Sequence, residues 1–223
     1  MNIAVAIDGP AGAGKSTIAK AVSKKLGFIY VDTGALYRTV GLAAMRQNID
    51  IKDNSQVQDL LSKIKVELTF DDNGTQIVLL NGENVGESIR TPQASMMASD
   101  ISALPIVRAF LLDLQRNMAA ENNVIMDGRD IATVVLPNAQ VKMFLTASPE
   151  VRAERRYKEL VQKGINANYD EVLQDVITRD YNDSHREVAP LKPSEQSVIA
   201  DTSDLNFEES VNLIENIIFQ KIS

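Results

Sequence analysis

Short apolar runs alternate with helical patterns near the start of the chain. Residues 3–8 (IAVAID) are apolar and stop at a glycine, which predicts a buried parallel strand. Residues 15–26 have helical periodicity and end at Gly27, a typical helix stop. A second strand is predicted at 28–32 and a second helix at 34–48. This alternation favours an α/β fold with a parallel sheet.

The periodicity changes further along the chain. Residues 65–70 and 75–80 alternate between polar and apolar side chains, and DDNG (71–74) and NGENV (81–85) supply hairpin signals. The pattern predicts a small antiparallel meander with one exposed face. Because the meander interrupts an α/β chain, we expect it to be an insertion and not part of the core.

The second half of the chain returns to buried strands and helices. Strands are predicted at 123–127, 141–146 and 196–201. Helices are predicted at 91–121 with a break around Pro105, at 149–163, at 169–187 and at 206–222. The expected architecture therefore has five core strands with crossover helices, one β-rich insertion, and an arginine-rich segment after the fourth strand. Met96, Met97 and Met118 are predicted to be core residues.

Composition and charge narrow the class of protein. The 223 residues are 44% hydrophobic and 24% charged, as in ordinary globular proteins. Cysteine is absent, which excludes disulfides and thiol chemistry. No transmembrane-length run or signal peptide is found, so we expect a cytoplasmic protein. The net charge of −7 argues against binding of polymeric nucleic acid.

The arginines are nevertheless unevenly placed. They gather in VRAERRYKEL (151–160) and more thinly at 178–187 and 126–130. Local positive charge in an acidic protein indicates either a small anionic ligand held in a cleft or a set of solvated helix faces. Spacing alone leaves both interpretations open.

A phosphate-binding motif follows the first strand. GPAGAGKS (9–16) matches G-x-x-x-x-G-K-[ST], with a predicted strand before it and a helix after it. Glycines allow backbone N–H groups to converge on an anion, and the helix N-terminus adds partial positive charge. Lys15, expected to be a solvated loop residue, can reach the β- and γ-phosphates, and the Ser16 hydroxyl can ligate Mg²⁺. The motif predicts binding of ATP.

Two further segments end predicted strands beside this loop. In VDTGALYRTVG (31–41), Thr33 can cap the next helix and Arg38 lies one turn inside it. This arrangement is either an ordinary capped helix or a phosphate clamp. VIMDGRDIAT (124–133) places Asp127, Arg129 and Asp130 in a turn at the carboxyl edge of the sheet, where open α/β folds bind ligands.

The motifs together resemble a known family. IDGPAGAGKST, DTGALYR, DGRDIATVV, RAERR and REVAPL occur in this order, and they make nearly the whole chain similar to bacterial cytidylate kinases, the CMP/dCMP branch of the nucleoside monophosphate kinases. DTGALYR with DGRDIATVV is far more specific than the P-loop alone. The meander resembles the insertion of that bacterial branch, which favours this family over adenylate, guanylate or shikimate kinases.

The resemblance implies a domain organisation. It implies one P-loop kinase domain over residues 1–223, an α/β P-loop NTPase-type three-layer fold with a five-stranded parallel sheet. The core would span about 1–32, 104–147 and 164–223. A monophosphate-binding region with the β insertion would span about 33–103, and an arginine-rich helical lid about 148–163. We expect a monomer that does not bind membranes.

The resemblance also implies residue roles. The ATP phosphates would be bound by Gly9, Pro10, Ala11, Gly12, Ala13, Gly14, Lys15, Ser16 and Thr17, with Ser16 on Mg²⁺. The CMP phosphate would be bound by Arg38, Arg129 and Arg186, the ribose by Arg179 and Asp183, and the cytosine by Ser99, Arg108 and Asp130. The remaining substrate-binding residues would be Thr33 (where many members carry Ser), Tyr37, Asp127 and Gly128. The catalytic groups would be Lys15, Arg129 and the lid arginines Arg152, Arg155 and Arg156.

The implied reaction transfers the γ-phosphoryl group of ATP to CMP or dCMP and yields ADP and CDP or dCDP. Since a phosphate oxygen is already anionic, no catalytic base is needed, and we expect no such role for the single histidine, His185. An alcohol kinase would need a base, such as Asp32 or Asp130. A GTPase-like switch is disfavoured because the chain lacks an N-K-x-D motif.

Overall fold

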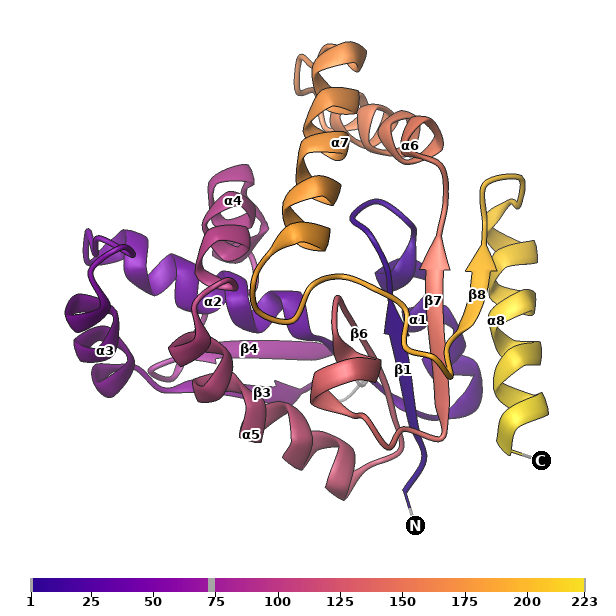
Figure 1. The fold of residues 1–223 in the computed structure, drawn as a ribbon, viewed down its shortest axis with the longest axis horizontal. Helices are drawn as coiled ribbons and strands as arrows, with labels where there is room; N and C mark the ends of the chain where they lie inside the picture. Colours follow the sequence, from indigo (N-terminus) through magenta and orange to yellow (C-terminus); the bar gives the residue numbers. More distant parts are fainter. Residues whose placement is uncertain (1, 72–74, 223) are drawn as a thin grey trace.

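A five-stranded parallel sheet forms the centre of the molecule. The computed structural model describes residues 2–71 and 75–222. The strands are β1 (Ala4–Asp8), β2 (Ile29–Asp32), β6 (Val124–Gly128), β7 (Val141–Thr146) and β8 (Val198–Asp201), in the order β2-β6-β1-β7-β8 (Figure 1). Asp8 lies opposite Gly128, and Asp32 lies opposite Asp127. The register therefore brings the predicted strand-end residues to one edge, and the expected α/β fold is confirmed.

Helices cover both faces of this sheet. On one face Val5, Ile7 and Met143 pack with side chains of α1 (Lys15–Leu26) and α8 (Phe207–Ile222). On the other face Ala6 and Met126 pack with α5 (Pro105–Glu121) and with the single π-helical turn η2 (Ile131–Val135). Because successive strand residues point to opposite faces, the continuous apolar strands supply both layers of the core.

The predicted meander forms a second, antiparallel sheet. Its strands are β3 (Val66–Phe70), β4 (Gln76–Leu80) and β5 (Glu83–Asn84). The hairpin signal at 71–74 lies partly outside the described residues. The sheet shares a core with α2 (Thr33–Arg46) and with α3 (Asn54–Lys63), a helix for which the sequence analysis made no prediction. The three strands lie to one side of the parallel sheet, in agreement with an insertion (Figure 1).

Two paired helices stand above the carboxyl ends of the parallel strands (Figure 1). They are α6 (Pro149–Gln162) and α7 (Tyr169–His185), and they share a small apolar cluster of Ala153, Val172 and Val176. The predicted arginine-rich segment is α6. Each helix begins at a side-chain cap: Ser148 accepts from the Val151 N–H, and Asn168 accepts from the N–H groups of Asp170 and Glu171.

Two local predictions need correction. Asp32, not Thr33, caps α2, because its carboxylate accepts from the Ala35 N–H at 3.0 Å. The predicted break around Pro105 is confirmed: the preceding helix ends at Ile101, and Pro105 is the first residue of α5, where its missing N–H and fixed φ are tolerated.

The helix α4 (Pro92–Ile101), which follows the 3₁₀ turn η1 (Ser88–Arg90), contains the second correction. Met96 is 65% exposed and is not a core residue, because it lies on the outer side of the helix. Met118 does pack against the core. Within the described residues no single helix is long and apolar enough to cross a membrane. Only α4 and α5 taken together, bent by 102°, reach that length and composition.

Candidate active site

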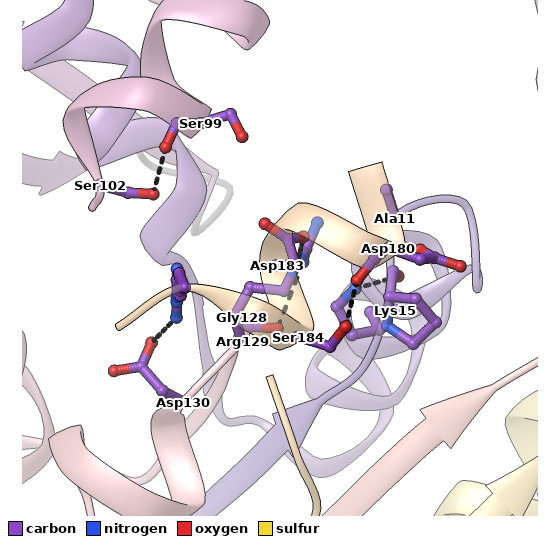
Figure 2. Close-up of polar contacts among 12 residues, drawn as sticks. Ala11, Lys15, Ser99, Ser102, Gly128, Arg129, Asp130, Asp180, Asp183 and Ser184 are labelled. Carbon is purple, nitrogen blue, oxygen red and sulfur yellow. Dashed lines mark hydrogen bonds and ion pairs between the residues drawn. The ribbon is translucent and has the colours of Figure 1, made fainter. Parts of the chain in front are cut away.

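A cleft of about 660 Å³ runs along the carboxyl edge of the parallel sheet, beneath α6 and α7. Loop, sheet and helix residues that are far apart in the sequence line it together (Figure 2). The predicted site residues that line it are Ala11, Gly12, Gly14, Lys15, Ser16, Thr17, Thr33, Tyr37, Arg38, Ser99, Arg108, Asp127, Gly128, Arg129, Asp130, Arg155, Arg156, Arg179, Asp183 and Arg186. The predicted site residues outside its lining are Gly9, Pro10, Ala13 and Arg152.

The glycine-rich loop begins tightly against the sheet. A Cβ at Gly9 would lie 1.9 Å from the Leu145 carbonyl oxygen, so only glycine fits there. The loop ends at Gly14, and α1 begins at Lys15. The Lys15 side chain folds back toward Pro10, whose carbonyl oxygen accepts from Lys15 Nζ at 2.7 Å. The N-terminus of α1 thus opens onto the cleft, as anion binding requires.

Lys15 is buried and is not the solvated residue that we expected. Its side chain lies at the floor of the cleft, with 6% of the residue exposed. Burial, and then the positive charge of Arg129, lower the pKa of Lys15 to about 7, against the opposing effect of Asp127 and Asp8. A buried cation beside a second cation is stabilised by an anion, and phosphates bound in the loop would supply several negative charges.

The Ser16 hydroxyl and the Asp127 carboxylate line the cleft together with Lys15. Ser16 Oγ donates to Asp127 Oδ2 at 2.9 Å, and Tyr30 Oη donates to Asp127 Oδ1 at 2.8 Å. Burial, and then the nearby Asp32, raise the pKa of Asp127. Mg²⁺ prefers oxygen ligands and is often bound through one or two protein groups together with substrate phosphates. The hydroxyl of Ser16 and the carboxylate of Asp127 fit that requirement. Sequence analysis assigned only Ser16 to the metal.

Four arginines line the same cleft as the loop. Arg38 pairs with Asp32 at 2.8 Å, and Arg129 pairs with Asp183 at 2.8 Å (Figure 2). Arg186 Nε donates to the Ala189 carbonyl. Arg179 has a buried Nε with no hydrogen-bond partner in the described part of the chain, and burial together with Arg129 lowers its pKa. Arginines concentrated around one cavity favour the anionic-ligand interpretation over solvated helix faces.

A polar cluster closes the far end of the cleft. One Asp130 carboxylate oxygen contacts Arg108, and the other lies 3.4 Å from an Arg186 nitrogen. Burial raises the pKa of Asp130, although both arginines oppose that effect. Ser99 lines the same end, and its carbonyl accepts from Ser102 Oγ at 2.8 Å (Figure 2). Asp130, which the resemblance places at the cytosine, is thus already in contact with two arginines.

Thr33 and Tyr37 line the cleft from α2. Thr33 Oγ1 donates to the Asp127 carbonyl at 2.8 Å, which joins α2 to the end of β6. Gly128 lies beside this contact, because a Cβ there would come within 2.7 Å of Thr33 Oγ1. The Tyr37 ring lies under the Arg108 guanidinium, with 5.7 Å between the guanidinium carbon and the ring centroid. These contacts fix the first turns of α2, which carry Arg38.

The three arginines of α6 have different surroundings. Arg156 is half-exposed and pairs with Glu159 at 3.0 Å. Arg155 donates to the Thr202 carbonyl at 2.7 Å. Both line the cleft, but Arg152 is 2% exposed and lies outside it. Arg152 instead contacts the glycine-rich loop from its position on α6, and a role for all three arginines at a transferring phosphoryl group stays a prediction.

Two residues that support the site are not among the predicted site residues. Tyr30 was read only as part of an apolar strand, although its hydroxyl binds Asp127. Asp8 is 1% exposed, and its carboxylate accepts from the N–H groups of Ile131 and Ala132 at 2.7 and 2.8 Å. Burial raises the pKa of Asp8 to about 6. A carboxylate at the end of an apolar strand, directly before the glycine-rich loop, was the available signal.

The arrangement of the cleft defines the class of protein. The glycine-rich loop and the arginines line one cavity at the carboxyl edge of a parallel sheet, which is the organisation of a P-loop kinase. The family model for cytidylate kinase matches residues 5–220. The chain therefore belongs to the cytidylate kinase family.

Relatives of known name agree with this assignment. The chain is 48% identical over 217 residues to the cytidylate kinase of Carboxydothermus hydrogenoformans, covering 97% of each chain. It is 45% identical over 220 residues to the cytidylate kinase of Caldicellulosiruptor bescii, covering 99% of this chain and 97% of that one. A crystal structure of an uncharacterized protein from Eubacterium ventriosum, 10% identical, covers 99% of each chain with a TM-score of 0.52 and shows a shared fold alone.

Proposed function

We propose that the protein transfers the γ-phosphoryl group of ATP to CMP or dCMP and yields ADP and CDP or dCDP. The observation that carries the proposal is that one cleft is lined by Lys15 and the glycine-rich loop together with Arg38, Arg129 and Arg179. Two polyanions, a donor and an acceptor, are the ligands that such a cleft would stabilise. The names of the relatives, and the family to which the chain belongs, support CMP as the acceptor.

The donor would bind on the loop side. Backbone N–H groups of the loop and the N-terminus of α1 would bind its phosphates, and Lys15 would exchange the Pro10 carbonyl for a phosphate oxygen. Ser16 and Asp127 would hold Mg²⁺, which when bound neutralises charge on the phosphates. The ordered positions of these groups mean that little reorganisation accompanies charge development in the transition state.

The acceptor would bind on the arginine side. Arg38, Arg129 and Arg186 would bind its phosphate. Arg38 and Arg129 now pair with carboxylates, and an incoming phosphate would replace these ion pairs or share the two arginines with the carboxylates. Arg179 and Asp183 lie on the same side of α7 and would bind the ribose. Ser99, Arg108 and Asp130 form the polar end suited to a base.

The proposal includes transfer without a catalytic base. Among the described residues, every carboxylate that lines the cleft already accepts from a donor. Asp32 and Asp130 do so from arginines, and Asp127 does so from two hydroxyls. His185 is exposed at the end of α7, stacks on Tyr181, and does not line the cleft. An anionic phosphate oxygen needs no deprotonation, so in-line transfer would rest on positioning and charge stabilisation.

We further propose that α6 acts as part of a lid and that residues 33–103 form the acceptor-binding region of a single domain. Arg155 and Arg156 line the cleft from α6, so closure over two bound nucleotides would bring positive charge toward their phosphates and exclude water. The proposed enzyme acts as a cytoplasmic monomer, and its net charge of −7 gives no support for binding to polymeric nucleic acid or acidic membranes.

A comparison of CMP with cytidine tests the reaction class. ADP formation by the purified chain with ATP and Mg²⁺ should be rapid with CMP and at background with cytidine, since only CMP presents a phosphate oxygen. Lys15→Ala serves as the control for contaminating kinases. Use of cytidine in place of CMP would favour an alcohol kinase with an aspartate base and would contradict the proposal.

A further inference from the structure

Arg152 occupies an unusual position for an arginine of a helix above a cleft. It lies in the first turns of α6 with 2% of its surface exposed, in contact with the glycine-rich loop and with α7. Its Nη1 donates to the Ala11 carbonyl at 3.1 Å and to Asp180 Oδ1 at 3.0 Å. Its Nε donates to the Ala147 carbonyl at 2.8 Å, and its Nη2 donates to Asp180 Oδ2. The guanidinium thus joins three separate segments of the chain.

The glycine-rich loop packs directly on this arginine. Gly12 has a φ of +77°, and a Cβ at Gly12 would lie 3.1 Å from Arg152 Cβ and 3.4 Å from the Arg152 carbonyl oxygen. The close approach is independent of the hydrogen bond to Ala11. Both observations place the peptide between Ala11 and Gly12 against the start of α6, and they exclude a water layer between the two.

This contact determines how one peptide plane of the loop is turned. In a trans peptide the C=O and the following N–H point in opposite directions. Because the Ala11 carbonyl points to Arg152, the Gly12 N–H points away from Arg152, on the side of the loop that does not face α6. Ala11 and Gly12 both line the cleft, whereas Arg152 does not. The N–H is therefore held in the orientation that a phosphate-binding loop requires.

We propose that Arg152 is a positioning residue for the phosphate-binding loop, and that Asp180 acts through it. Asp180 supplies the negative charge that pairs with the buried guanidinium and fixes its orientation. Its own backbone is fixed in α7, where its carbonyl accepts from Ser184 Oγ at 2.7 Å (Figure 2). The orientation of the loop then depends on α6 and α7 together. The inference rests on the proposed function, in which this loop binds the phosphates of ATP.

The inference separates Arg152 from its neighbours on α6. Arg155 and Arg156 line the cleft and can meet a nucleotide, whereas the Nε, Nη1 and Nη2 groups of Arg152 all donate to protein oxygens. Removal of its partner Asp180 should therefore weaken donor binding without a matching effect on the acceptor. A residue with only a structural role would alter stability and leave both affinities unchanged, or change both together.

The test measures donor and acceptor affinities separately in the full chain. Asp180→Asn removes the charge that orients Arg152 and keeps the side-chain shape, and Arg152→Lys removes the planar fork that serves Ala11 and Asp180 at once. The matched control is Glu215→Gln, which removes the Lys25–Glu215 ion pair between α1 and α8, away from the cleft. Calorimetric titrations with Mg·ATP and with CMP would give the two dissociation constants for each variant.

We expect the dissociation constant for Mg·ATP to rise about tenfold in Asp180→Asn and at least as much in Arg152→Lys, while that for CMP changes less than twofold. The double variant should be no worse than the poorer single variant, because both act on one contact. The amide resonance of Gly12 should shift in both variants and stay unchanged in Glu215→Gln.

Two results would overturn the inference while leaving the proposed function intact. One is unchanged Mg·ATP affinity in folded variants. The other is loss of the fold in both variants, since the pair would then serve stability and not the loop. If the wild-type chain itself failed to bind ATP and to phosphorylate CMP, the proposed function would fall and this inference with it.

Discussion

Replacing Asp130 with Asn tests how the cleft distinguishes cytosine from uracil. One Asp130 oxygen contacts Arg108 and the other lies 3.4 Å from an Arg186 nitrogen. An ionised carboxylate has about four acceptor positions, so it can keep both arginines and still accept from the amino group of cytosine. Uracil has a carbonyl at that position and brings no proton. An unpaired buried group of this kind costs about 1–3 kcal/mol.

The expected change follows from this difference. The amide of Asn can turn its NH₂ toward the uracil carbonyl, so the penalty for UMP should shrink. We expect the ratio of kcat/KM for CMP to kcat/KM for UMP to fall roughly tenfold, which corresponds to about 1.4 kcal/mol. Asp130→Asn also removes the negative charge that pairs with two buried arginines. Loss of one partner of a buried ion pair costs about 3–5 kcal/mol of stability.

The assay must separate these two effects. Measuring CMP and UMP on one preparation makes the ratio independent of the fraction of folded enzyme, and urea denaturation gives the loss of stability. Asp183→Asn is the matched control, because Asp183 is also buried and pairs with Arg129 but lies on the proposed ribose side. It should slow both reactions equally. An unchanged ratio in Asp130→Asn, or an equal narrowing in Asp183→Asn, would refute this account of base selection.

Four further predictions concern the loop, the acceptor phosphate, the metal and pH. Lys15→Ala should lower kcat by at least about a hundredfold, the usual scale for one strong transition-state contact, and a folded variant with normal turnover would exclude the assigned role. Arg129→Lys should raise KM for CMP far more than KM for ATP, because Lys lacks the planar fork of Arg. Steady-state kinetics with each substrate varied in turn would measure both values, and a larger rise in KM for ATP would mean that the two sites are exchanged. Tyr30→Phe removes the hydroxyl that donates to one oxygen of Asp127. We expect a several-fold rise in the Mg²⁺ concentration that gives half-maximal turnover, and weaker binding of Mg·ADP in calorimetric titrations. Binding of metal-free ADP should stay unchanged and serves as the control. Asp8 has a pKa raised by burial to about 6, so its stabilising contribution is complete below its ordinary pKa of 3.8 and is lost as the pH rises through 6. Between pH 4 and pH 7 the unfolding free energy of the wild type should fall by up to about 3 kcal/mol relative to that of Asp8→Asn, and a constant difference would contradict the burial argument.

The fold could be predicted from the sequence where a strand is buried on both faces of the sheet. Residues 3–8, 28–32 and 123–127 are short apolar runs with strong punctuation, and only a strand covered on both faces fits them. The helix α3 was passed over because three of its residues, Val57, Leu60 and Leu61, are buried within a polar segment. Its amphipathic pattern is short and depends on the second sheet for its partner.

The positions of the site residues could be predicted from the sequence where a motif fixes the geometry of the backbone. The loop at 9–16 and the turn at 126–130 were placed at the cleft as expected. Side-chain partners were harder to predict, because they depend on tertiary neighbours. Thr33 was assigned the cap of α2, but the Asp127 carbonyl engages its hydroxyl and leaves the cap to Asp32.

Helical spacing explains the remaining differences between prediction and structure. The pattern of α6 predicts three arginines on one helix but not which of them meets the glycine-rich loop, so Arg152 was grouped with Arg155 and Arg156. In the same way, the sequence of α4 does not specify that Met97 faces α2 near Gly41 while Met96 points outward. Both cases need the relative placement of two elements, which no local pattern contains.

We propose that this chain phosphorylates a pyrimidine monophosphate at a site that selects cytosine. The most direct measurement is kcat/KM of the purified wild-type chain with ATP and Mg²⁺ for CMP, dCMP, UMP, AMP and GMP as acceptors. We expect efficient use of CMP and dCMP, weak use of UMP, and no use of AMP or GMP, because a purine overfills the pocket at Ser99 and Asp130. Equal or better use of AMP or GMP than of CMP would contradict it.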